Sequence, residues 1–162
     1  MKLVERNAQS ITFALSQRDC ELLVFLLRLY PVLDPTFHRI TRSAAGNAFE
    51  SEQQILTESV TTEQNANRGR VDQFIRNRLT PRRAGGNSAM TGANFHLTLT
   101  WTEADWLLRL INDVRVGCWV RLGRPDTNLL HSLQIKAAQV PDFAAMELGG
   151  LVQHTLLDAL DG

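Results

Sequence analysis

Histidine and cysteine are the residues of this chain best suited to catalysis or metal binding, and their spacing favours neither. The chain has four histidines and two cysteines: His38, His96, His131, His154, Cys20 and Cys118. No two of them stand at the short intervals of a zinc site, and no H-E-x-x-H, G-x-S-x-G or phosphate-loop motif occurs. Both cysteines lie in apolar helical patterns, which indicates buried, inert thiols. We therefore expect no catalytic residue, no metal site and no cofactor.

One arginine falls where a helix should be apolar. On a helix predicted for 101–122, a turn of 100° per residue places Arg115 between Leu108 and Ile111, near the centre of the buried stripe. That stripe comprises Ala104, Leu107, Leu108, Ile111, Val114, Cys118 and Leu122. A buried guanidinium needs an acceptor, because an unpaired buried charge costs several kcal/mol.

Two interpretations of Arg115 follow from this position. In the structural one, Arg115 pairs with a carboxylate or with carbonyl oxygens at a helix end, such as those at 30–34. Asp34 is the preferred partner, followed by Asp19 and Glu21. In the functional one, Arg115 lines a pocket beside Asn112 and Asp113 and meets a small anionic ligand or a partner. We favour the structural interpretation.

A run of arginines leads up to the middle of the chain. It comprises Arg68, Arg70, Arg76, Arg78, Arg82 and Arg83, with Asp72 as the only acid among them. These side chains could contact phosphates of a nucleic acid. The favoured alternative is that they balance the acids just before them, Glu50, Glu52, Glu58 and Glu63.

Local signals predict a small sheet and two well-capped helices. Residues 2–6 and 11–16 alternate in polarity around a turn at 7–10, which is typical of a hairpin. Ser16 and Asp19 then form a capping box before an apolar helix over 17–30. The same order recurs with a strand at 95–100, a capping box of Thr100 and Glu103, and the helix at 101–122. We expect the strands to pair antiparallel and the two helices to form the centre of the protein.

The remaining segments are less regular. The polar stretch 50–80 predicts one long or two consecutive amphipathic helices, with Gly69 as the weak point. Residues 80–94 contain glycines and few apolar anchors, so we predict a flexible loop. Pro141 begins a C-terminal helix in which Gly149 and Gly150 allow close packing.

Composition sets the class of protein. The chain has 162 residues, of which 44% are hydrophobic, and a formal net charge of zero. This length suits a single domain over 1–162. The first residues lack the apolar core of a signal peptide, and the longest apolar run is too short to span a bilayer. We expect a cytoplasmic protein with no membrane partner and no strong affinity for nucleic acid.

The stretch LTWTEADWLLRLINDVRVGCWVRLG, at 99–123, resembles a family of uncharacterised, mainly actinobacterial proteins catalogued as domain of unknown function 2017. The matching residues are Leu107, Leu108, Arg109, Asn112, Asp113, Arg115, Arg121, Leu122 and Gly123. The family has no established activity or cofactor. What the resemblance implies is the order of the helices and a protein-interaction function in a bacterial cell.

These observations lead to one expected architecture and one leading function. We expect a mainly α (α+β) helical bundle with a small antiparallel sheet built from the N-terminal hairpin and the strand at 95–100. The leading function is a non-enzymatic interaction or adaptor module that binds protein, either another copy of itself or a different chain. Trp106, Trp119 and Val120 are candidates for the interaction surface, although core packing on a second side of the helix is the favoured alternative for all three.

Overall fold

The computed structural model describes residues 1–39, 47–79, 95–125 and 136–161. Its elements are β1 (Lys2–Arg6), β2 (Ser10–Leu15), α1 (Gln17–Arg28), the 3-10 turn η1 (Pro35–Phe37), α2 (Asn47–Phe74), the π-helical turn η2 (Ile75–Leu79), β3 (Phe95–Thr100), α3 (Trp101–Arg121), the 3-10 turn η3 (Ala137–Gln139) and α4 (Val140–Asp161). The mainly α architecture with a small antiparallel sheet is confirmed. The predicted loop at 80–94 lies outside the described residues.

The sheet forms one end of the molecule, and the order of its strands is β1-β2-β3, all antiparallel. Ile11 of β2 pairs with Leu99 of β3, and Phe13 pairs with Leu97. These four side chains are buried, while β1 is exposed along its whole length. One face of the sheet therefore lies against the helices, and its alternating sequence follows from that one-sided burial.

Both helices that follow a strand begin with the predicted capping box. Ser16 accepts a hydrogen bond from the backbone N–H of Asp19, and the Asp19 carboxylate accepts one from the backbone N–H of Ser16. Thr100 and Glu103 repeat this exchange at the start of α3. Gly123 then ends the helical segment with a φ of +90°, a conformation that glycine adopts without strain.

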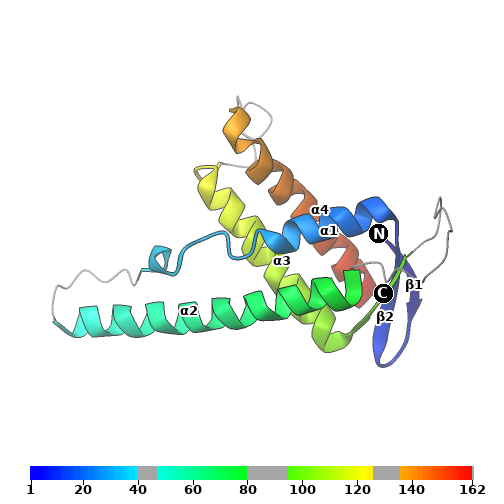
Figure 1. Cartoon of the computed structure of the whole chain (residues 1–162), viewed down its shortest axis with the longest axis horizontal. Helices are drawn as coiled ribbons and strands as arrows, with labels where there is room; N and C mark the ends of the chain where they lie inside the picture. Colours follow the sequence, from blue (N-terminus) through cyan, green and yellow to red (C-terminus); the bar gives the residue numbers. More distant parts are fainter. Residues whose placement is uncertain (40–46, 80–94, 126–135, 162) are drawn as a thin grey trace.

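The expectation that α1 and α3 together form the centre is only half correct. α3 is central, and the largest helix–helix contact joins it to α4 (Figure 1). α1 buries one face, through Cys20, Leu23, Leu26 and Leu27, and leaves Phe25 exposed. A helix with apolar residues nearly all round thus lies at the edge of the bundle, where solvent reaches its outer side.

α2 is one continuous helix that passes through Gly69, and only its last turns are anchored in the core. From Glu50 to Arg70 no residue of α2 is buried, whereas Val71 and Phe74 are. The first part of α2 extends away from α3 and α4 (Figure 1). The inner side of this part is held to the segment after α1, since Gln53 donates to the carbonyl oxygen of His38 and Gln64 donates to that of Leu33.

Trp106 of α3 is the anchor for α2. Its ring is 9% exposed and packs edge-on against Phe74, with the ring centroids 5.5 Å apart. The indole N–H donates to the Asn67 side chain at 3.0 Å, and Asn67 in turn donates to the Tyr30 hydroxyl at 3.3 Å. The Arg70 guanidinium covers the ring at 4.2 Å from its centroid. A single side chain thus joins α3 to α2 and, through Asn67, to the end of α1.

Gly117 allows the segment after α1 to lie directly on α3. A Cβ atom at position 117 would lie 2.5 Å from the Cβ of Val32, a distance that real side chains do not adopt. Gly117 is accordingly buried although it has no side chain. The close approach of Val32 explains a glycine in the middle of a helix, where it otherwise weakens helix formation.

Replacing Gly117 tests this close approach. Gly117→Ala should lower the free energy of unfolding by roughly 1–3 kcal/mol, the usual cost of overpacking. Gly69→Ala is the matched control within a helix, because no heavy atom lies within 4 Å of its added Cβ. It should gain about 0.5–1 kcal/mol. Urea unfolding in dilute solution, followed by circular dichroism, measures both; a Gly117→Ala variant as stable as the parent would contradict the contact.

Replacing Trp106 tests the anchor of α2. Trp106→Phe keeps an aromatic ring but leaves the Asn67 carbonyl oxygen without its donor, so we expect a loss of roughly 1–3 kcal/mol in the free energy of unfolding. Trp119→Phe is the control, since Trp119 is partly exposed and donates to the carbonyl oxygen of Pro125. It should change stability by no more than about 0.5 kcal/mol. Equal effects of the two changes would show that Trp106 has no special part in the fold.

Candidate functional site

A groove runs along the outer side of α3, between α2 and α4. Its first part is a cleft of about 220 Å³ between α2, α3 and the segment after α1. Its second part, about 460 Å³, reaches Leu108 and Arg109 of α3 and Leu157 of α4. Both parts share Glu63, Asn112 and Asp113, so they form one surface, which we call the α3 groove.

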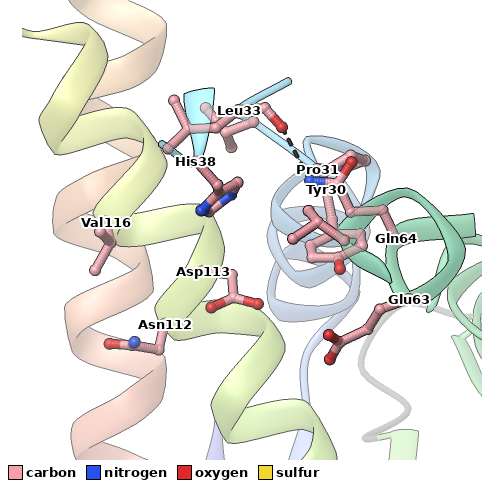
Figure 2. Close-up of a pocket in the computed structure, with 11 residues that line it drawn as sticks. Tyr30, Pro31, Leu33, His38, Glu63, Gln64, Asn112, Asp113 and Val116 are labelled. Atoms are coloured by element: carbon pink, nitrogen blue, oxygen red, sulfur yellow. Dashed lines mark hydrogen bonds between the residues drawn. The ribbon is translucent and has the colours of Figure 1, made fainter. Parts of the chain in front are cut away.

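The α3 groove is lined by both apolar and polar side chains. Val116 and Leu157 are exposed at its two ends, and Leu108 and Val60 are half-buried in its walls. The polar side chains of Glu63, His38 and Asp113 come from three separate segments and border the same space, as Figure 2 shows. The groove thus has a polar middle and apolar ends.

The two carboxylates in the middle of the groove have no ion pair with a described residue. Asp113 stands four residues after Arg109, but Arg109 is engaged with Asp105 on its other side, with 3.1 Å between Nη2 and Oδ2. Neighbouring atoms that displace water raise the pKa of Asp113, and the charge of Glu63 raises it further, whereas His38 lowers it. A positive group placed between the two carboxylates would therefore find a favourable potential.

Arg115 lies next to this groove, but the sequence prediction of its environment was wrong. Its side chain is exposed, and its guanidinium donates to Oε1 of Gln153 at 3.0 Å. Gln153 donates in turn to Oδ1 of Asn112 at 3.3 Å. The predicted partner Asp34 takes no part in these contacts; its carboxylate instead caps η1 by accepting from the backbone N–H and hydroxyl of Thr36.

The error lay in where the prediction placed the centre of the buried face of α3. Trp106, Leu110 and Gly117 are buried in addition to most of the predicted stripe, so the face is wider and is turned away from Arg115. Arg115 is left at the edge that borders α4, where its side chain lies beside Gly149 and Gly150 at ordinary contact distance. A Cβ on Gly150 would lie 3.7 Å from Nε of Arg115.

The predicted interaction residues are also placed differently. Trp106 is buried as the anchor of α2, so it does not belong to an exposed patch, and Val120 is half-buried. Trp119, the third predicted residue, is exposed. Among the described residues, the most exposed large apolar side chains are Ile55 of α2 and Leu151 of α4, at 66% and 67%. Core packing, the alternative favoured for Trp106, is therefore correct.

The arginine run is only partly free to meet a ligand. Arg70 covers the Trp106 ring, and Arg78 pairs with Glu103 at 2.9 Å. Arg68 and Arg76 are exposed, and Arg82 and Arg83 lie outside the described residues. The structure thus gives two of the four described arginines a partner within the fold.

The remaining reactive side chains are separated from one another. Both cysteines are free and buried, and burial raises the pKa of the Cys118 thiol to about 11. Such a thiol is a poor nucleophile at neutral pH. His96 is exposed on β3, His154 lies beside Asp158 on the surface of α4, and His131 lies outside the described residues. Among the described residues, no group of three or more potential ligands could hold a metal ion.

Sequence reasoning selected Asn112 and Asp113 but missed Glu63 and His38. Glu63 stands among several acids of a polar helix, and His38 follows a turn opened by Pro35. Neither local pattern identifies its residue as part of a binding site. They reach the groove because α2 and the segment after α1 pack side by side.

The pKa of Asp113 has a consequence for stability. A raised native pKa means that the folded protein holds this proton more tightly than the unfolded chain does. The contribution of the protonated Asp113 to the free energy of unfolding is therefore fully present below the ordinary pKa of 3.8. It is lost as the pH rises through the higher pKa of the folded protein.

Asp113→Asn should remove this loss. At neutral pH we expect the variant to be more stable than the parent by up to about 0.5 kcal/mol, the scale of surface changes. The difference should disappear well below pH 3.8. Asp105→Asn, on the same helix, breaks the pair with Arg109 and should give no gain. Urea unfolding across a pH series measures both variants, and a less stable Asp113→Asn at neutral pH would contradict the raised pKa.

Comparison of the chain with protein-family models, with curated proteins and with solved structures finds no match. Within the described part of the chain, no helix combines the length and the apolar character needed to cross a membrane. Function is therefore argued from the α3 groove and from the surfaces beside it.

Proposed function

We propose that this chain is a non-enzymatic, protein-binding module of the cytoplasm, and that its α3 groove binds a segment of a partner protein. The proposal agrees with the interaction function that the resemblance to domain of unknown function 2017 implies. The observation that carries it is the pair of carboxylates, Glu63 and Asp113, in the middle of a groove whose ends expose Val116 and Leu157.

The chemistry of the groove selects the kind of segment. A lysine or arginine side chain would bring a positive charge between the carboxylates and offset their mutual repulsion. Apolar side chains on either side of it would cover Val116 at one end and Leu108 with Leu157 at the other. The matching ligand is thus a short segment with a basic residue between apolar ones.

The size of the groove indicates weak, reversible binding. It follows α3 from Leu108 to Val116, about 12 Å at the rise of an α-helix. Complexes that bury less than roughly 1,200 Å² in total are usually transient. An interface as short as this one falls in that class. We therefore place the chain among transient binding modules.

The other two functions have less support. Arg115 lines neither part of the α3 groove, and its guanidinium already donates to Gln153. A nucleic acid would have to bind through an arginine run in which Arg70 and Arg78 are already engaged. No contact in the described residues favours either one over a basic peptide segment.

Selection from a random displayed peptide library tests the proposed function. We expect the enriched peptides to place lysine or arginine between apolar residues. Asp113→Lys should weaken their binding by about tenfold or more, the equivalent of ~1.4 kcal/mol per tenfold. Fluorescence anisotropy with a labelled synthetic peptide measures the Kd.

Glu147→Lys supplies the matched control. Glu147 is exposed on α4 and does not line the groove, so the same change of charge there should leave the Kd within about twofold, in the range of ordinary surface changes. The proposal fails if no peptide is enriched above background, or if Asp113→Lys and Glu147→Lys affect binding equally.

A further inference from the structure

The side of α2 that faces away from the bundle presents a line of uncharged, exposed residues. They recur at alternating spacings of four and three residues, which keeps them on one side of a helix. They are Ile55, Ser59, Thr62, Ala66, Gly69 and Gln73, and all six are exposed. Val60 and Glu63, which line the α3 groove, point to other sides of the helix, so this outer face of α2 is a separate surface.

Two residues of this outer face are unexplained by the fold of one chain. Ile55 is a large apolar residue that is 66% exposed. Gly69 weakens the helix, yet a Cβ atom at its position would meet no heavy atom within 4 Å. Within the described part of the chain, Ile55 is thus left largely uncovered, and the space beside Gly69 is open.

The spacing of these residues fits a second copy of the chain. Ile55 lies seven residues before Thr62, and Gly69 lies seven residues after it. If two α2 helices crossed antiparallel at Thr62, Ile55 of each copy would lie against Gly69 of the other. A two-fold symmetric pair makes this contact twice, which is how most homodimers are built.

The charges of α2 select the antiparallel direction. The part from 47 to 63 carries Glu50, Glu52, Glu58 and Glu63 and has no lysine or arginine. The end of α2 and the η2 turn that continues it, from 68 to 78, carry four arginines and one acid, Asp72. Antiparallel pairing brings the acidic half of each helix alongside the basic half of the other, whereas parallel pairing would bring like charges together.

We propose that two copies of this chain associate through the outer faces of their α2 helices, packed antiparallel about Thr62. α2 has 28 residues, so it is roughly 40 Å long and about 10 Å wide. A pair of such helices buries on the order of 400 Å² per copy. This area belongs to weak interfaces, so the dimer forms at high protein concentration and dissociates on dilution.

Disulfide trapping tests the pairing. Thr62→Cys places two thiols next to each other across the two-fold axis, and mild oxidation of the concentrated protein should link them into a covalent dimer. Thr61→Cys is the matched control: Thr61 and Thr62 are both exposed, and each hydroxyl donates to the carbonyl oxygen four residues earlier. Residue 61 lies about 100° around the helix, away from the contact, and should not cross-link. The native Cys20 and Cys118 are buried and do not compete.

A second variant separates dimer formation from folding. Gly69→Gln has open space in the single chain and improves helix propensity, so it should fold at least as well as the parent. In the pair its side chain would occupy the space of Ile55 from the other copy. The mass measured by sedimentation of concentrated protein should therefore approach twice the 18.2 kDa of one chain for the parent. For Gly69→Gln it should stay near the mass of one chain.

Three results would overturn the proposal. The parent could sediment as a single chain at the highest concentration reached. Thr61→Cys could cross-link as readily as Thr62→Cys. Gly69→Gln, folded by circular dichroism, could retain the dimer.

Discussion

The indole of Trp106 holds together the parts of the molecule that matter for binding. Its hydrogen bond to Asn67 and its contact with Phe74 attach the last turns of α2 to α3. Because no residue of α2 from 50 to 70 is buried, these turns determine where the helix points. The wall of the α3 groove that carries Glu63, and the outer face that carries Ile55, both depend on that direction.

Local signals were sufficient for the sheet and for the starts of two helices. The exchange between Ser16 and Asp19, and that between Thr100 and Glu103, involve residues three apart, so the sequence alone contains both partners. The hairpin was equally visible, since one-sided burial imposes an alternating pattern on β2. The exposed outer side of α1 could not be read in this way, because its apolar residues continue onto the solvent-facing side.

The environment of Arg115 could not be derived from α3 alone. A helical projection depends on which residues are taken as the centre of the buried face: Trp106 and Leu110 were left out of it, and glycine has no side chain to count. Gly117 is buried because Val32 packs on it, and that contact is set by the course of the chain after α1. The same limit applies to the groove: Asn112 and Asp113 were identified on α3, whereas Glu63 and His38 reach it from segments that are distant in sequence.

α2 has the mechanical properties of a lever. It is fixed near its C-terminal end and braced further out by the bonds from Gln53 and Gln64 to backbone carbonyl groups. Over a helix of 28 residues, a tilt of about 5° at the fixed end displaces the far end by roughly 3–4 Å, given the rise of 1.5 Å per residue. A small change in the packing around Trp106 therefore produces a larger displacement at the N-terminal end of α2, several turns away.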